Sequence, residues 1–218
     1  MKNEKFSEGI QNKKTFYHII LDRSGSMSNC WKQTMSGLQD QFTKVFQLQQ
    51  QFPTQEFYVS LCIFDNVIEF PVPVSPAYGN YYNSFRGILP RSNTALFDAI
   101  GDSIRHLEFH AGNFLDRNEA SVIVVVLTDG HENASTRYSA QMIRREMDRL
   151  QATDLWTFSF LGADFDITET AAAFNAGAKS TMNFSKAQIH LAFDELECKI
   201  ADYAMEKEQG NIKKEFLD

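Results

Sequence analysis

The sequence predicts an α/β protein with a doubly wound, mostly parallel central sheet, one antiparallel edge strand, and helices on both faces. Two features predict this class. Short β-branched or aromatic runs alternate with longer segments in which apolar residues recur every three or four positions. The runs 16–21 and 121–128 are apolar almost throughout rather than alternating, which is typical of parallel strands buried on both faces.

Turn residues and helix-capping signals divide the chain into elements. The elements expected in order are a strand over 16–22, a helix from 31 that Pro53 closes, strands over 56–64 and 67–74, a helix entered at 92–96, a strand over 121–128, a helix over 139–150, a strand over 155–161, a helix over 167–175, a strand over 178–183, and a final helix from 189. Because the turn at Asp65–Asn66 has two residues, the strand 67–74 must pair antiparallel, and Pro71 and Pro73 place it at an edge. The segment 75–93 has no regular pattern.

We expect three regions: a polar leader over 1–14, one domain over 15–208, and a charged C-terminal tail over 209–218. The last residues, from Glu206 onward, are expected to fray because they are mostly charged. No internal repeat and no Pro- or Gly-rich linker divides the sequence. The expected capping residues are Ser28 or Asn29 for the first helix, and the capping-box pair Ser185 and Gln188 for the last.

The composition excludes several classes of protein. A net charge of −7 and a pI near 5.3 give no basic surface for nucleic acid or an anionic membrane. No apolar run approaches the ~20 residues that a membrane helix needs, and the N-terminus lacks the apolar segment of a signal peptide. Cys30, Cys62 and Cys198 are scattered, which favours reduced packing thiols in a cytoplasmic protein.

A candidate site begins where the first strand ends, in Asp22-Arg23-Ser24-Gly25-Ser26. One carboxylate and two hydroxyls on a short turn are hard oxygen donors that suit Mg²⁺ or Ca²⁺. Taken alone, the turn fits a helix N-cap equally well. Asp129 follows the strand 121–128, and Thr94 heads a helix. Right-handed crossovers bring these ends to one edge, so five oxygen donors are expected to converge there.

The segments Asp22-x-Ser24-x-Ser26, Thr94 in Thr-Ala-Leu-Phe-Asp-Ala, and Thr128-Asp129-Gly130 resemble the von Willebrand factor type A (VWA) domain. The resemblance covers about residues 15 to 205 and includes all three segments of that family's metal-ion-dependent adhesion site (MIDAS). It implies a Rossmann-like fold and a divalent cation, usually Mg²⁺, with Ca²⁺ or Mn²⁺ as alternatives. The implied ligands are the hydroxyls of Ser24, Ser26 and Thr94, with Asp22 and Asp129 binding directly or through water. An acidic residue of a partner protein would complete the coordination, and the chain is similar to compact single-domain bacterial and phage members.

Several neighbouring residues have two possible interpretations. Asp98 either orients the Thr94 segment or is a surface acid of the helix, and His131 and Glu132 are either extra ligands or rim residues. Arg23 either steers acidic partners or lies on a solvated rim. The aromatic residues between Tyr78 and Phe85 either form a contact patch or cover the edge of the sheet. His18, within a buried strand, is interpreted as a core histidine.

The function expected is a protein-binding module without enzymatic activity. The alternative is a metal-dependent hydrolase or phosphoryl-transfer enzyme that uses Asp22. A haloacid dehalogenase-type enzyme would need a second Asp where Ser24 stands, and Ser24 and Ser26 lack the Gly-x-Ser-x-Gly frame of a serine hydrolase. A third possibility is an adaptor subunit of a larger ATPase or phage assembly, which would use the same site toward a different partner.

Overall fold

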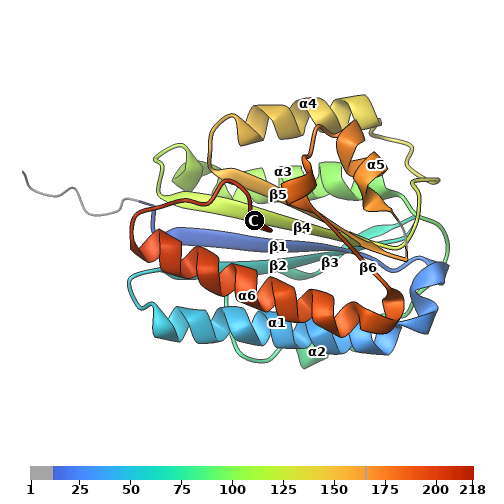
Figure 1. Ribbon diagram of the computed structural model, residues 1–218, viewed down its shortest axis with the longest axis horizontal. Coiled ribbons are helices and arrows are strands. Elements are labelled where there is room, and N and C mark those ends of the chain that lie inside the picture. The colour runs from blue at the N-terminus through green and yellow to red at the C-terminus, as the bar shows by residue number, and fades with distance from the viewer. Residues whose placement is uncertain (1–11, 165) are drawn as a thin grey trace, which may run out of the picture.

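The computed structural model describes residues 12–164 and 166–218, which form three layers with a sheet between two sets of helices (Figure 1). The strands are β1 (Lys14–Asp22), β2 (Glu56–Phe64), β3 (Ile68–Pro76), β4 (Ala120–Thr128), β5 (Trp156–Ala163) and β6 (Thr181–Phe184). Their order in the sheet is β3-β2-β1-β4-β5-β6, and all neighbours are parallel except β2 and β3. The predicted α/β class with one antiparallel edge strand is therefore confirmed.

Helices cover both faces of the sheet. They are α1 (Trp31–Gln51), α2 (Tyr82–Phe85), α3 (Leu96–Leu115), α4 (Ala140–Gln151), α5 (Ile167–Ala173) and α6 (Ile189–Glu208). Helices α1 and α6 lie side by side on one face, and α3, α4 and α5 lie on the other (Figure 1). Within the described ranges, none of the helices combines the length and the hydropathy that a membrane crossing requires.

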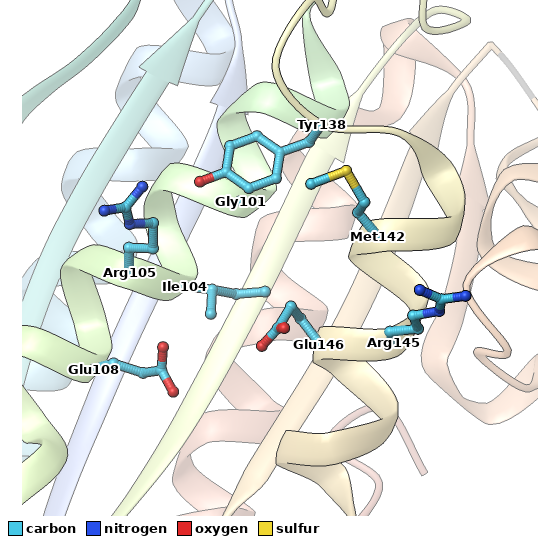
Figure 2. A pocket seen from close by; sticks show the side chains of 8 residues that line it. All are labelled: Gly101, Ile104, Arg105, Glu108, Tyr138, Met142, Arg145 and Glu146. Carbon is cyan, nitrogen blue, oxygen red and sulfur yellow. The ribbon is translucent and has the colours of Figure 1, made fainter.

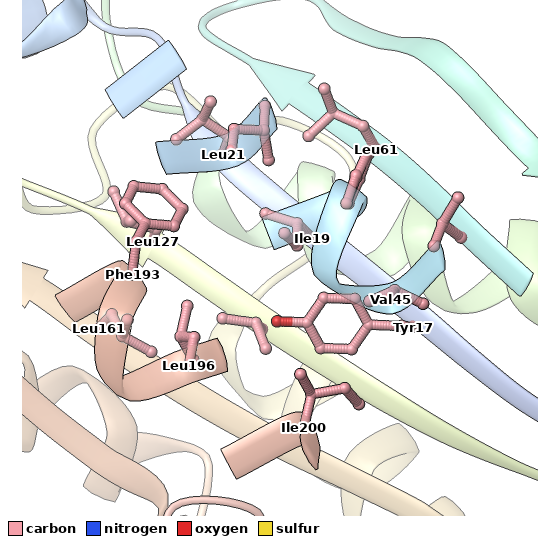
Figure 3. Packing of buried hydrophobic residues seen from close by; sticks show 14 of the residues in the cluster. Tyr17, Ile19, Leu21, Val45, Leu61, Leu127, Leu161, Phe193, Leu196 and Ile200 are labelled. Atoms are coloured by element: carbon pink, nitrogen blue, oxygen red, sulfur yellow. The ribbon is translucent and has the colours of Figure 1, made fainter. Parts of the chain in front are cut away.

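The two central strands supply apolar side chains to both faces. Tyr17, Ile19 and Leu21 of β1 pack under α1 and α6, as Figure 3 shows, while Phe16 and Ile20 face the opposite cluster. This alternation explains why the strand is apolar almost throughout. The strands β1 and β4 therefore place the residues that follow them at one edge of a rigid sheet.

A glycine allows α1 and α6 to approach closely. A Cβ atom added to Gly37 of α1 would come within 2.3 Å of the Phe193 ring of α6. Real Cβ atoms do not approach this closely, so a side chain at this position would push the two helices apart. The close packing of α6 against α1 therefore depends on the absence of a side chain at Gly37.

The predicted capping residues do not cap their helices. A short 3-10 helix over Gly25–Asn29 precedes α1, so Cys30 takes the N-cap position without a side-chain hydrogen bond. The Ser28 hydroxyl donates instead to the carbonyl of Gly25 at 2.7 Å. The contact between Ser185 and Gln188 joins their side chains at 3.2 Å and leaves the capping box unformed. These predictions were wrong because a 3-10 turn precedes each helix.

The C-terminal segment folds back onto the domain. Phe216 is fully buried, with its ring centroid 6.0 Å from that of Tyr17 and 6.5 Å from that of Tyr203. The expectation that this segment frays was wrong, because Phe216 anchors it in the core and its charged side chains pair with Lys179 and Asp154. At the other end, residues 1–11 of the predicted leader lie outside the described residues, and Asn12 is buried, donating to the Ala120 carbonyl at 2.7 Å. The division into leader, domain and tail stays a prediction.

A buried lysine fastens the C-terminal end of α6 to the sheet. Lys207 Nζ donates to the Lys14 carbonyl at 2.7 Å and to the hydroxyls of Thr15 and Ser121 at 2.8 and 2.6 Å. Burial lowers the pKa of Lys207 well below its ordinary value. These partners lie at the amino ends of β1 and β4, so Lys207 acts structurally, at the sheet edge opposite the candidate site.

The cysteines agree only partly with the prediction that all three are packing residues. Cys30 and Cys62 are buried free thiols, as expected, whereas Cys198 on α6 is exposed. The sequence does not reveal this difference, because which face of a helix a single Cys occupies depends on how the helix packs.

The core histidine gives the protein a defined sensitivity to acid. His18 is fully buried, with Nδ1 2.6 Å from Ser60 Oγ, which confirms its interpretation as a core residue. Burial and the nearby charge of His106 lower the pKa of His18 to about 3. The unfolded chain binds a proton at this residue below pH ~6.5 while the folded protein does not, so stability falls as the pH falls.

We therefore expect His18 alone to lower the free energy of unfolding by about 2 kcal/mol between roughly pH 7 and pH 5. Urea denaturation of the wild type and of His18→Gln at both pH values measures this contribution as the difference between their pH slopes. Identical slopes in the two proteins would contradict it.

Candidate functional site

Two acidic residues lie together at the carboxyl ends of the central strands. Asp22 is the last residue of β1, and Asp129 follows Thr128, the last residue of β4. The strands are parallel neighbours with Leu21 opposite Leu127, so the residues beyond them emerge at the same edge. Ligands of open α/β sheets bind at such an edge.

The Asp22 carboxylate is held at both oxygens. Thr128 Oγ1 donates to Oδ2 at 2.6 Å, and the backbone N–H of Ser24 donates to Oδ1 at 2.6 Å. Burial raises the pKa of Asp22 to about 6, the hydrogen bonds from Thr128 and Ser24 oppose that rise, and the charge of Asp129 adds to it. A nearby cation would stabilise the ionised carboxylate in this setting.

Two serine hydroxyls converge on the second acid. Ser24 Oγ and Ser26 Oγ lie 3.0 Å apart, and they donate to Asp129 Oδ1 at 3.4 and 2.7 Å. Ser24 is buried and Ser26 is exposed, so the cluster opens to solvent on the Ser26 side. The N–H of Gly25 donates to the Ser92 carbonyl at 3.2 Å, which joins this loop to the segment that carries Thr94.

Thr94 is clamped by the loop that follows β4. Its backbone N–H donates to Asn133 Oδ1 at 2.9 Å, and its carbonyl accepts from the N–H groups of Asn133 and Ala134 at 3.0 and 3.2 Å. The Thr94 hydroxyl lies 3.8 Å from the position that a Cβ atom on Gly130 would take. The structure thus brings all five predicted residues to one edge of the sheet. The sequence does not single out Asn133, because Asn is ordinary in a polar loop.

Glu132 supports the loop rather than projecting into the site. Its Oε2 accepts from the N–H of Phe97 at 3.0 Å, at the start of α3, and its Oε1 accepts from the N–H groups of Ala134 and Ser135 at 2.8 and 2.7 Å. Its carboxylate therefore caps α3 and shapes the loop, which disfavours the interpretation as an extra ligand. His131 is exposed in the same loop.

Asp98 holds the other end of that loop. Its Oδ1 accepts from the N–H groups of Arg137 and Tyr138 at 3.0 and 2.9 Å, and its Oδ2 accepts from the N–H of Thr136 at 3.1 Å. Burial would raise the pKa of Asp98, but these backbone donors and the Arg137 charge lower it below its ordinary value. Asp98 therefore orients the loop that clamps Thr94, in agreement with the positioning alternative.

Arg23 is neither a steering residue nor a solvated one. Its side chain is 6% exposed, and its Nε lies 3.1 Å from Asp65 Oδ2, while its Nη2 pairs with Glu69. Arg91 Nε binds the same Asp65 oxygen at 2.7 Å. Both interpretations of Arg23 were wrong, because the side chain turns inward and joins the end of β1 to Asp65, which follows β2, and to Glu69 of β3.

A lysine from a distant part of the sequence also reaches the site. Lys186 Nζ lies 2.6 Å from Asp129 Oδ2 and donates to the Ser26 carbonyl at 3.1 Å. The sequence carries no local signal for this contact, since Lys186 belongs to the turn between β6 and α6. A lysine in a polar turn is ordinarily solvated.

The chemistry of these donors fits a hard divalent cation. Two carboxylates and three hydroxyls are available, and all are hard oxygen donors. Among the described residues, no group of three or more His, Cys, Asp or Glu is arranged to hold a metal, so an acid-rich cage is not formed in that part of the chain. With so few carboxylates, a divalent cation held by these donors would keep some of its coordination positions for water.

The aromatic segment near the site is largely structural. Tyr81 is fully buried, with its ring centroid 5.0 Å from that of Phe42 and 4.0 Å from that of Tyr78. Phe85 is also buried, whereas Tyr78 is 43% exposed. Tyr81 and Phe85 pack on Phe42 of α1, so their buried rings do not form a contact patch. The side chain of Tyr82 lies outside the described part of the structure.

A cavity of about 450 Å³ lies away from this edge, between α3 and α4 (Figure 2). The Tyr138 ring covers Gly101 at one end, and Ile104 lines the floor. Its charged side chains are those of Arg105, Arg145, Glu108 and Glu146. The two glutamates pair with Arg149, which joins α3 to α4 beside the cavity.

Solved structures share this fold, although no family model and no curated protein matches the chain. The vWF domain of the type V pilus tip protein Mfa5 from Porphyromonas gingivalis is 10% identical, with a TM-score of 0.62 over 88% of this chain and 96% of that chain. The SpRpn10 VWA domain is 12% identical, with a TM-score of 0.53 over 78% and 87% of the two chains. Proximal thread matrix protein 1 from the mussel byssus, solved with a zinc-occupied MIDAS motif, is 16% identical, with a TM-score of 0.57 over 89% of this chain and 46% of that chain.

Proposed function

We propose that this chain, which has the von Willebrand factor type A fold, is a protein-binding module that works through a divalent cation at the ends of β1 and β4. The proposed ligands are the hydroxyls of Ser24, Ser26 and Thr94, with Asp22 and Asp129 binding the cation directly or through water. Their hard oxygen donors favour Mg²⁺, with Ca²⁺ or Mn²⁺ as alternatives. An Asp or Glu of a partner protein completes the coordination.

The observation that carries this proposal is the convergence of the donors from three segments. The hydroxyls of Ser24 and Ser26 meet at Asp129 Oδ1, while Thr128 and the Ser24 N–H orient Asp22 beside them. When bound, the cation supplies an electrophilic centre for an incoming carboxylate. The hydroxyl ligands are neutral and withdraw little of the cation's positive charge, and the site contains only two carboxylates. The cation therefore still attracts a third carboxylate, that of the partner protein.

The contacts of Asp22 favour binding over catalysis. An enzyme that uses Asp22 as a nucleophile needs a carboxylate oxygen directed at its substrate. Both oxygens of Asp22 accept hydrogen bonds at 2.6 Å, from Thr128 and from Ser24, and the side chain is fully buried. Phosphatase and esterase assays test the enzymatic alternative, which would be supported by turnover that disappears in Asp22→Asn.

The adaptor interpretation uses the same site and differs only in the partner, which would belong to a larger ATPase or phage assembly. We retain it as a variant of the proposal rather than as a competing mechanism. The free thiols Cys30, Cys62 and Cys198 support a cytoplasmic location for the module.

A titration with Mg²⁺ tests the metal-binding part of the proposal. The melting temperature of the wild type is expected to rise with Mg²⁺ concentration, because an ion that binds only the folded state stabilises it by mass action. Ser26→Ala removes one donor and is expected to weaken Mg²⁺ affinity by about tenfold, a loss of about 1.4 kcal/mol. Calorimetric titration and thermal unfolding measure the two effects.

Ser28→Ala is the matched control. Ser28 is an exposed serine in the same loop, but its hydroxyl donates to the Gly25 carbonyl and not to an acid. Its variant is expected to bind Mg²⁺ as the wild type does. A wild-type melting temperature that Mg²⁺, Mn²⁺ and Ca²⁺ all leave unchanged would refute the cation site.

A further inference from the structure

The Lys186 ammonium contacts the carboxylate of Asp129, which the proposed cation would bind. Its Nζ is 2.6 Å from Asp129 Oδ2, and the Asp129 side chain is fully inaccessible to solvent. The same Nζ donates to the carbonyl of Ser26, whose hydroxyl donates to the other oxygen of Asp129. The positive charge of Lys186 therefore lies among the donor atoms of the site and not merely near them.

The backbone directs Lys186 toward this position. Its N–H donates to Asp164 Oδ1 at 3.0 Å, and the N–H of Asp164 donates to the Phe184 carbonyl at 2.8 Å. Asp164 follows β5 and has a left-handed backbone with φ of 53°. The turn between β6 and α6 is thereby fixed to the end of β5, which reduces the conformational entropy that Lys186 loses on reaching Asp129.

We propose that Lys186 is a tethered competitor of the divalent cation, an inference that rests on the proposed function. Its ammonium neutralises Asp129 in the metal-free protein, and the incoming ion displaces it into solvent. Two cations cannot both bind Asp129 at short range without strong repulsion, because like charges about 4 Å apart repel substantially near a protein surface. Lys186 thus sets the concentration of divalent cation at which the site fills.

The side chain can leave the site at modest cost. Lys186 is 19% exposed, so its ammonium is next to solvent, and a lysine ammonium is strongly hydrated on a flexible stem. Arg23 differs in this respect, because its guanidinium is 6% exposed and is paired with both Asp65 and Glu69. Of these two cationic side chains near the site, Lys186 is therefore the exchangeable one.

Calorimetric titration of Mg²⁺ into the wild type, Lys186→Met and Lys199→Met tests this competition. Lys199 is the matched control, because it is 18% exposed and pairs with Glu195 at 3.3 Å, further along α6. Lys186→Met is expected to bind Mg²⁺ at least about tenfold more tightly than the wild type, and Lys199→Met equally tightly. Affinities within about threefold of one another in all three proteins would overturn the inference and leave the proposed function standing.

Chemical labelling gives a second readout that does not depend on a variant that folds. Acetylation of the wild-type protein by an N-hydroxysuccinimide ester, followed by mass spectrometry, reports how accessible each amine is. Labelling of Lys186 is expected to increase several-fold in saturating Mg²⁺ while labelling of Lys199 stays constant. Unchanged labelling of Lys186 in a protein that binds Mg²⁺ would contradict displacement. If neither the wild type nor Lys186→Met binds Mg²⁺, the proposed function itself is refuted. If only Lys186→Met binds Mg²⁺, the result supports Lys186 as the competitor and refutes a cation site in the wild type.

Discussion

Asp65→Ala is expected to lower the free energy of unfolding by about 3 kcal/mol, because it leaves the buried Arg23 guanidinium with only the half-exposed Glu69 as its partner. The Asp65 side chain is 1% exposed, and its Oδ2 lies 3.1 Å from Arg23 Nε and 2.7 Å from Arg91 Nε. Its Oδ1 also accepts from the N–H of Val67 at 2.7 Å. Urea denaturation monitored by circular dichroism measures the loss.

Arg91→Ala separates the stability contributed by the buried ion pair of Asp65 with Arg23 from that of its exposed pair with Arg91. The Arg91 side chain is 57% exposed, so its ion pair with Asp65 is screened, and its removal is expected to cost less than about 1 kcal/mol. Equal losses in Asp65→Ala and Arg91→Ala would show that the Arg23 pair contributes no more than a surface contact. Mg²⁺ affinity should also fall in Asp65→Ala, because Arg23 and Arg91 connect the segment before Thr94 to β1.

Asp22→Asn is expected to reduce Mg²⁺ affinity by at least about a hundredfold, or roughly 2.7 kcal/mol, while leaving the metal-free protein folded. The amide keeps the volume of the carboxylate. Its oxygen can still accept from the Ser24 N–H, and its NH2 group can donate to Thr128 Oγ1, because a hydroxyl both donates and accepts. It removes one of the two negative charges of the proposed site, and charge count is a main determinant of affinity for hard cations. Calorimetric titration measures the loss.

Asp102→Asn controls for a general effect of removing one negative charge. Asp102 pairs with Arg137 at the surface, and its neutralisation is expected to leave Mg²⁺ affinity unchanged. Capture experiments with the immobilised protein extend the comparison to the partner: proteins retained in Mg²⁺ should be lost in EDTA and in Asp22→Asn, and kept in Asp102→Asn. If the same proteins were retained without Mg²⁺ and by Asp22→Asn, this would contradict an interface in which the partner binds the cation.

The sequence predicts those parts of the fold that depend on local patterns. Strand β2 occupies the predicted range Glu56–Phe64, and β3 is the antiparallel edge strand that Pro71 and Pro73 indicate. The sequence also predicts that the five candidate residues lie at one edge of the sheet, because each stands at the end of a predicted strand or at the start of a predicted helix. Their role as metal ligands stays a prediction.

The missed features all depend on long-range contacts. The inward turn of Arg23 requires Asp65, from the turn after β2, and Glu69 of β3, and the burial of Phe216 requires Tyr17 and Tyr203. Neither set of contacts leaves a periodic pattern in the sequence, so hydrophobic spacing and charge could not reveal them. The contact of Lys186 with Asp129 likewise exists only because β6 returns the chain to the edge where β4 ends.

The two outer strands have a consequence for how this protein associates with others. An exposed strand edge offers unpaired backbone groups that can template pairing with a foreign strand. In β3, Pro71 and Pro73 lack the N–H needed for such pairing, and its register with β2 is interrupted twice. The opposite edge, β6, is only four residues long. Both outer strands therefore offer little backbone to a strand of another chain, which disfavours association by strand addition at either of them.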